Sequence, residues 1–304
     1  MKKILQIFGI LLSIFVLIVI VFAVTWLFLN KTNGQIISSG EKRKYLFYVP
    51  ESYDPTVPTP LVFNIHGFAQ WPANQMKVSG WNELADQFGF IVVYPSGTGF
   101  PLRWRVSEDP ENPGGPQKEV AFFSDLIDKL EDEYNIDSSR IYANGLSNGG
   151  GMTLQLACNL SDRIAAIGSV AGAYLFDFEE CQPEHLVPAI FFHGKEDQIV
   201  PFGGGPSERY SLPFPNIPEF VHSYAQKNEC DPDPYTVLET TNVSGIRYSD
   251  CREDANVVFY TIADGGHTWP GGSPLPEWIT GKTSQEIDAT RLMWEFFEGY
   301  TIDD

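Results

Sequence analysis

The stretch IYANGLSNGG, residues 141–150, decides the fold of this chain. Its first part is apolar and predicts a buried strand, and the residues that follow predict the start of a helix. Ser147 stands between the two, with Gly145 two positions before it and Gly149 two positions after it. A sharp turn from strand to helix needs small residues at both positions, because side chains there would clash. The pattern therefore predicts a nucleophile elbow with Ser147 at its apex.

Short apolar runs rich in Val, Ile, Phe and Tyr recur along the chain and indicate strands. They lie at residues 45–49, 61–65, 90–94, 140–143, 165–170, 189–192 and 257–262. Several are apolar at consecutive positions, as expected for parallel strands that are covered on both faces. Apolar spacings of three and four predict helices over residues 120–134, 81–88, 150–158 and 284–300. This alternation predicts a doubly wound α/β fold of the α/β-hydrolase type, with loops at 202–218 and 231–254.

The N-terminal segment, residues 1–30, differs in composition from the rest of the chain. Residues 4–29 are almost wholly apolar and follow Lys2 and Lys3, and ~26 residues exceed the ~20 that span a bilayer as a helix. The segment therefore predicts a signal anchor, or a signal peptide if it is cleaved, and the charge distribution places the remainder outside the cytoplasm. We expect residues 31–304 to form one catalytic domain that touches the membrane through this segment only.

The net charge argues against one class of partner, and the cysteines indicate disulfide bonds. A net charge of −19 argues against nucleic acid as a partner, because phosphate binding relies on clustered Lys and Arg. Four cysteines in an exported chain indicate disulfides rather than buried thiols or metal ligands. Of three possible pairings, Cys158 with Cys181 and Cys230 with Cys251 is the simplest. No pattern indicates an oligomeric state.

A serine hydroxyl needs a histidine base, and that histidine needs an acid to orient it. In this fold the chain order is serine, acid, histidine. His267 follows the strand at 257–262 among glycines and is the best candidate for the base. For His193 a hydrogen bond to the backbone is the favoured interpretation, while His185 and His222 lack a supporting context.

The acid is expected after the strand that ends at residue 192. Asp197 lies five residues beyond that strand, so it is the natural candidate to orient His267. Glu196 is its close rival, and Asp264 is less attractive because it lies only three residues from the histidine.

The oxyanion of an acyl-transfer reaction needs two backbone donors. The amide of Asn148, directly after Ser147, is one candidate, and the amide of Phe68, after the strand at 61–65, is the other. His66 is expected to shape the second loop. No motif for a metal or an organic cofactor is present in the sequence.

Together these segments resemble the polyhydroxybutyrate depolymerase and feruloyl esterase-like branch of the α/β-hydrolases. The matching pieces are YVP at 48–50, LVFNIHG at 61–67, YP at 94–95, GLSNGG at 145–150, HG at 193–194, VP at 200–201 and GHTWPG at 266–271. The resemblance implies that Ser147, Asp197 and His267 form a catalytic triad and that the two cysteine pairs above are the family's bridges.

The resemblance also suggests parts of the substrate site. Trp104 and Trp269 look like family aromatics that stack on a phenolic or sugar ring, although core packing is an equal possibility for Trp104. One departure is that this branch tends to carry paired Asp residues where this chain reads QKEV, residues 117–120. A role of those Asp residues therefore does not carry over to this chain.

These patterns predict a serine esterase that needs no cofactor. The expected substrates are feruloyl or acetyl esters of plant polysaccharide, or short polyhydroxyalkanoate esters. Three alternatives stay open: a serine peptidase of the prolyl-oligopeptidase type, a non-catalytic cell-surface binding protein with a hydrolase fold, and an acyltransferase in which an alcohol replaces water.

Overall fold

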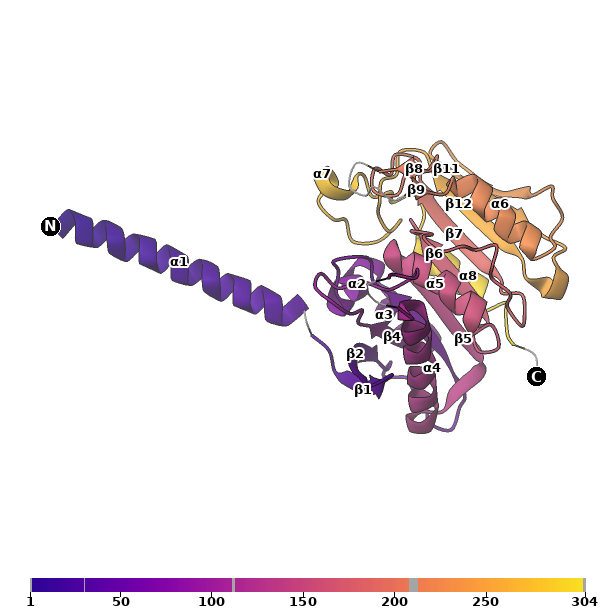
Figure 1. Cartoon of the computed structure of the whole chain (residues 1–304), viewed down its shortest axis with the longest axis horizontal. Helices are drawn as coiled ribbons and strands as arrows, with labels where there is room; N and C mark the ends of the chain where they lie inside the picture. Colours follow the sequence, from indigo (N-terminus) through magenta and orange to yellow (C-terminus); the bar gives the residue numbers. More distant parts are fainter. Residues whose placement is uncertain (1, 30, 111–112, 208–212, 303–304) are drawn as a thin grey trace.

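The structure, a computed structural model, describes residues 2–29, 31–110, 113–207 and 213–302, and a ten-stranded sheet forms the centre of this part (Figure 1). The strands lie in the order β1 (Gly34–Ser38), β2 (Glu41–Tyr48), β4 (Ile91–Pro95), β3 (Thr59–Ile65), β5 (Ile136–Leu146), β6 (Ala166–Val170), β7 (Ala189–Gly194), β12 (Val257–Ile262), β11 (Val243–Tyr248) and β10 (Tyr235–Glu239). From β4 to β12 every neighbouring pair is parallel, and the pairs toward both edges are antiparallel. The predicted α/β fold with a mostly parallel sheet is confirmed.

Helices cover both faces of this sheet (Figure 1). One face carries α4 (Gly115–Glu133), α5 (Asn148–Asn159) and α6 (Ile217–Lys227), and the other carries α2 (Pro72–Ser79), α3 (Trp81–Phe88) and α8 (Ala289–Phe297). In β3, Phe63 packs toward the first group and Val62 toward the second, and both are fully buried. Burial on both faces explains why the central strands are apolar at consecutive positions.

The structure corrects the two predicted loops. Residues 231–254 are not a loop, because they contain β10, β11 and the short helix η1 (Arg252–Asp254). The hairpin of β10 and β11 extends the sheet at its edge, where β10 is largely exposed and β11 only partly buried, so neither strand carries a continuous apolar run. The stretch 202–218 contains β8 (Gly205–Pro206), β9 (Pro213–Phe214) and the start of α6, while residues 208–212 lie outside the described part. Three helices were not predicted: α2, α6 and α7 (Glu277–Thr280).

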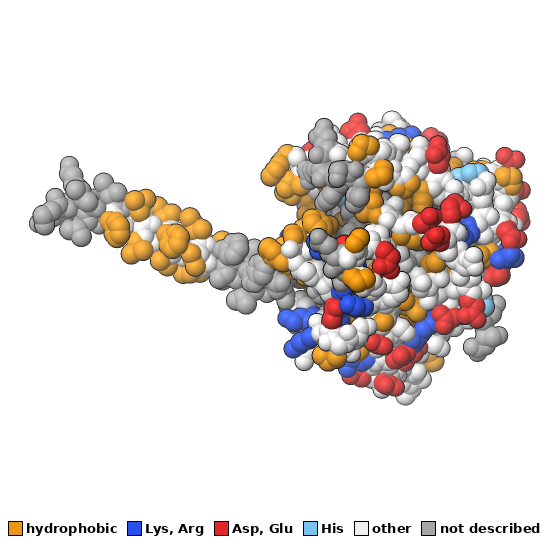
Figure 2. Space-filling model, viewed as in Figure 1, with side chains coloured by type: hydrophobic (Ala, Val, Ile, Leu, Met, Phe, Trp, Pro, Cys, Tyr) orange, Lys and Arg blue, Asp and Glu red, His pale blue; other side chains and the backbone are white. Residues whose placement is uncertain are grey.

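The N-terminal segment forms α1 (Lys2–Leu29), which leads away from the sheet (Figure 1). Its described side chains, those of residues 6, 8–21 and 24, are exposed and mostly hydrophobic, whereas acidic side chains are scattered over the rest of the surface (Figure 2). In the described part of the chain, no helix combines the length and the apolar character that a membrane crossing requires. The predicted membrane anchor is thus not confirmed.

Two disulfides pair the four cysteines as predicted. Cys158 at the end of α5 is bonded to Cys181, and Cys230 after α6 is bonded to Cys251. Each bridge closes a loop of about 20 residues, which stabilises the fold by roughly 3 kcal/mol if the effect is mainly on the unfolded chain.

The turn from β5 into α5 is packed directly against the end of β3. A Cβ atom on Gly149 would lie 2.2 Å from the carbonyl oxygen of Ile65, and one on Gly145 would lie 2.5 Å from the carbonyl carbon of Gly149. These neighbours are backbone atoms of β3 and of the first turn of α5, which are packed against each other and cannot move aside. The two glycines therefore allow the turn to sit at the edge of the sheet.

We predict that Gly149→Ala lowers the free energy of unfolding by at least about 2 kcal/mol, because the added methyl group overpacks a rigid site. Urea denaturation measures this change. The matched control is Gly203→Ala on an exposed loop, where a Cβ meets nothing within 4 Å. Equal stability of the two variants would contradict the role given to Gly149.

Candidate active site

Ser147 connects β5 to α5 and is held in an uncommon backbone conformation. Its φ of 57° and ψ of −118° lie in a region that residues with a side chain rarely adopt. The Ser147 amide donates to Val170 O, and its carbonyl accepts from the amides of Gly151 and Ala173. The turn is therefore fixed by β6, by α5 and by the segment that follows β6. A positive φ in a tight turn from strand to helix is the backbone geometry of a nucleophile elbow.

Asp197 and His267 come together from the loops after two neighbouring strands. β7 and β12 are parallel, with Gly194 opposite Ile262, so the loops that follow them meet at the same edge of the sheet. The Nδ1 atom of His267 lies 2.7 Å from Oδ2 of Asp197. Because Nδ1 is engaged by the carboxylate, Nε2 is the ring nitrogen left to exchange a proton.

The Asp197 carboxylate is held by more than this one histidine. Its Oδ1 accepts from the amides of Ile199 and Val200, both at 2.8 Å. Burial alone would raise the pKa of this carboxyl, but the charge of His267 and the hydrogen bonds from His193 and His267 outweigh burial. The pKa of Asp197 is therefore well below its usual range, and the group is an anion at neutral pH.

His193 supports this carboxylate from the core. Its Nε2 donates to Val200 O at 2.9 Å and lies 3.4 Å from Oδ2 of Asp197. The hydrogen bond to the backbone agrees with the sequence interpretation of His193. The contact with Asp197 was not predicted, although the spacing of four residues across a strand end could have suggested it.

The rival residues are engaged elsewhere or point to solvent. Asp264 forms an ion pair with Lys282, and Glu196 is exposed. His185 is exposed as well, and the ring of His222 packs near Tyr248. None of these four contacts the Asp197–His267 pair by a hydrogen bond or ion pair in the described part of the chain.

Ser147 lines a mostly apolar cavity of about 240 Å³. Its apolar lining includes Val106, Ala173, Leu175, Ile199, Val200 and Phe214. Among the described residues no hydrogen bond joins the Ser147 hydroxyl to His267. Catalytic hydrogen bonds are often long before a substrate binds and shorten in the complex.

The two predicted oxyanion residues line the same cavity. Asn148 is the first residue of α5, and amides in the first turn of a helix have no partner within that helix. The positive end of the helix dipole favours negative charge at this point. Phe68 lies in a tight turn after β3, between Gly67, whose amide donates to Gln70 Oε1, and Ala69, whose amide donates to Leu102 O.

The two tryptophans predicted to stack on a substrate are both buried. Trp269 is 1% exposed, does not line the cavity, and donates from Nε1 to Thr290 Oγ1. Its burial does not fit a stacking role. Trp104 is 2% exposed and donates from Nε1 to His66 O, so it forms part of the cavity wall and packs in the core. Stacking on a ring requires an open face, and Trp269, which is buried away from the cavity, offers none.

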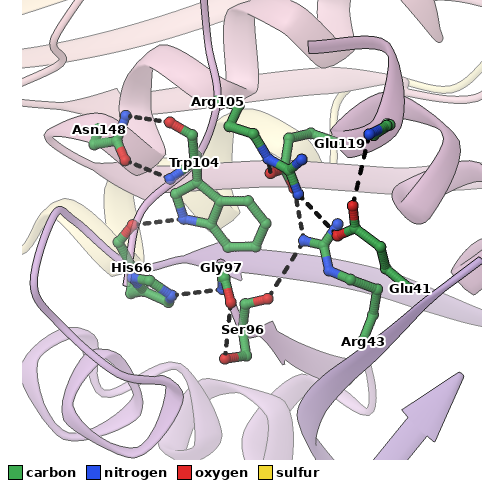
Figure 3. Close-up of polar contacts among 10 residues, drawn as sticks. Glu41, Arg43, His66, Ser96, Gly97, Trp104, Arg105, Glu119 and Asn148 are labelled. Carbon is green, nitrogen blue, oxygen red and sulfur yellow. Dashed lines mark hydrogen bonds and ion pairs between the residues drawn. The ribbon is translucent and has the colours of Figure 1, made fainter. Parts of the chain in front are cut away.

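A buried ion-pair network beside the cavity was missed by sequence reasoning (Figure 3). Glu119, fully buried on α4, accepts from Arg43 Nη2 at 2.6 Å and from Arg105 Nε at 2.8 Å. Arg105 also pairs with Glu41 at 3.0 Å. Glu119 falls on the apolar stripe of its helix, four residues before Phe123, and a carboxylate on such a stripe signals buried cationic partners. The sequence pattern could not identify those partners.

Within the described ranges, no three His, Cys, Asp or Glu side chains are grouped closely enough to hold a metal ion.

His66 links the loop after β3 to the loop after β4. Its Nε2 accepts from the Gly97 amide at 2.9 Å, and its Nδ1 lies 2.8 Å from Gly67 O, which it can reach only as a donor. Burial lowers the pKa of His66 to about 4 despite the hydrogen bond to Gly67, which acts in the opposite direction. The ring is therefore neutral at neutral pH and fixed as one tautomer.

This shift predicts a loss of stability in acid. The unfolded chain protonates His66 near pH 6.5 and the folded chain only near pH 4, so the free energy of unfolding falls as the pH drops through this window. The loss between pH 8 and pH 4.5 that belongs to His66 is roughly 2–3 kcal/mol. Urea denaturation should show a smaller loss for His66→Gln than for the wild type, and an unchanged loss for His185→Gln. Equal losses in all three proteins would refute the assignment.

The chain is similar to known esterases in sequence and in fold. The sequence model of the family described as esterase PHB depolymerase matches residues 44–182. A probable feruloyl esterase C of Aspergillus flavus is 30% identical over 231 residues, which cover 74% of this chain and 76% of that protein. The bifunctional acetylxylan esterase/xylanase of Neocallimastix patriciarum is 24% identical over 87% of this chain, which spans only 34% of that protein.

Among solved structures, an acetyl xylan esterase from Aspergillus awamori superposes with a TM-score of 0.57 at 18% identity. The match covers 77% of this chain and 93% of that chain, and it shows a shared fold. The family match and the 30% identity to the Aspergillus flavus protein show that this chain belongs to the esterase PHB depolymerase family of carboxylic ester hydrolases.

Proposed function

We propose that the protein is a serine esterase that works through an acyl-enzyme. The observation that supports this most directly is the buried Asp197–His267 hydrogen bond at the same edge of the sheet as the strained Ser147 turn. The carboxylate orients the imidazole and stabilises its charged form, which is what a serine hydroxyl needs from its base. The cavity that Ser147 lines is mostly apolar, and such surroundings strengthen electrostatic interactions compared with bulk water.

The proposed reaction has two steps. Ser147 Oγ attacks the ester carbonyl while His267 Nε2 takes its proton, and the amides of Asn148 and Phe68 stabilise the oxyanion. The intermediate collapses, the alcohol leaves with the proton from His267, and Ser147 is acylated. Water then attacks the acyl-enzyme with His267 again as the base, which releases the acid and restores the serine. Asp197 stays an anion throughout.

The substrate class follows from the cavity and the relatives together. The cavity of about 240 Å³ is lined mainly by apolar side chains and suits an aromatic or short aliphatic acyl group. Relatives carry the names feruloyl esterase and acetylxylan esterase. We therefore propose hydroxycinnamoyl or acetyl esters of plant polysaccharide as substrates, ahead of short hydroxyalkanoate esters.

The proposed place of action is outside the cytoplasm. Both disulfides persist in an oxidising compartment, and the apolar residues 4–29 after Lys2 and Lys3 fit an export signal that stays as an anchor or is cleaved. Intact producing cells, or their medium, should then hydrolyse an ester that cannot cross the membrane. Activity that appears only after lysis would refute this location.

We predict that Ser147→Ala lowers kcat for ester hydrolysis by about 10⁴-fold or more, because the acyl-enzyme can no longer form. The assay uses methyl ferulate, acetylated xylan and hydroxybutyrate oligomers, with a peptide amide included to detect peptidase activity. His185→Gln, an exposed histidine, serves as the control and should keep full activity. Full activity of a folded Ser147→Ala variant would overturn the proposal, and hydrolysis of the amide alone would indicate a peptidase.

A further inference from the structure

One wall of the cavity has no regular secondary structure of its own. Residues 103–107, which we call the wall segment, all line the cavity, and beyond an isolated bridge between Arg103 and Thr98 they pair with no strand. A segment without a hydrogen-bonded ladder must be held by side chains if the cavity is to keep its shape. The contacts of Trp104 and Arg105 show how this is achieved (Figure 3).

On one side the wall segment is fastened to α5. The Asn148 side chain uses both of its polar atoms on Trp104: Oδ1 accepts from the Trp104 amide at 2.7 Å, and Nδ2 donates to the Trp104 carbonyl at 3.1 Å. Two turns further along α5, Gln155 Nε2 donates to Val106 O at 2.7 Å. The residue whose amide is the proposed oxyanion donor is therefore bonded directly to the wall.

On the other side the wall segment is fastened to Glu119. Arg105 donates from Nε to Glu119 Oε1, and Arg43 of β2 donates to Glu119 Oε2. Glu119 is 0% exposed and Arg43 is 2% exposed, so both are held away from solvent screening. A buried carboxylate is retained at a large desolvation cost, and breaking such a network leaves uncompensated charge in the core.

We propose that Glu119 is a positioning residue for the esterase site. Through Arg105 it holds the wall segment in place. Because Trp104 of this segment is bonded to the Asn148 side chain, Glu119 thereby fixes both the cavity and the Asn148 amide that is the proposed oxyanion donor. The inference rests on the proposed function. Glu119 is the acidic residue of QKEV, the segment in which this chain departs from the family pattern. The inference therefore assigns a role to that segment: Glu119 bonds to two arginines that lie 76 and 14 residues away in the sequence.

The same helix offers an internal comparison. Arg163 bonds to Asp128 and Glu131, a second arginine held by carboxylates of α4. None of these three residues lines the cavity, and Arg163 is 20% exposed. The ion pairs of Arg163 therefore hold α4 in the fold without contact to the cavity, and they serve as the control for the Glu119 network.

The test measures kcat and KM with methyl ferulate and with p-nitrophenyl acetate, together with urea denaturation, on the full chain. Glu119→Gln is expected to lower kcat per folded molecule by about 10- to 100-fold, because small displacements of catalytic groups are that costly. The loss should be larger with the bulky feruloyl ester than with acetate. Glu119→Asp should restore part of kcat, and the control Glu131→Gln should keep wild-type kcat and KM.

If Glu119→Gln does not fold, Arg105→Gln decides the question, since it leaves the Arg43–Glu119 pair intact. A folded Glu119→Gln or Arg105→Gln with wild-type kcat on both esters overturns the inference, as does an equal loss of kcat in Glu131→Gln. A wild-type protein that hydrolyses neither ester would instead count against the proposed function.

Discussion

The strained turn at Ser147 is the constraint on which the site depends. A residue with a side chain occupies a left-handed conformation there, and two neighbouring glycines let the turn press against the backbone of β3. Such strain persists only where the surroundings over-determine it. The central parallel strands provide those surroundings, because β3, β5 and β6 are buried on both faces and fix the turn through backbone contacts.

Two buried carboxylates serve different purposes beside this turn. Asp197 receives two backbone amides and faces two histidines, so its charge is stabilised next to a ring that can gain and lose a proton. Glu119 faces two arginines, whose charge does not change at any relevant pH. The first arrangement suits proton transfer in the proposed mechanism, and the second suits the fixing of a cavity wall.

The sequence predicted those features that depend on local patterns. Continuous apolar runs identified the central strands, and small residues around Ser147 identified the turn. The chain order of the fold then pointed to Asp197 and His267, which the structure places in contact. The hairpin of β10 and β11 was missed because β10 is largely exposed and β11 only partly buried, so neither strand carries a continuous apolar run. The partners of Glu119 and the burial of Trp269 were not predictable, because they arise from residues far apart in the chain.

Labelling with a fluorophosphonate probe, followed by peptide mapping, tests the central claim most directly. Such a probe reacts with a serine that a histidine base activates. The account predicts a single modified residue, Ser147, and a labelling rate that falls by about 10³- to 10⁴-fold in Asp197→Asn, where His267 loses its orienting anion. Modification of another residue, or an unchanged rate in a folded Asp197→Asn protein, would contradict the account.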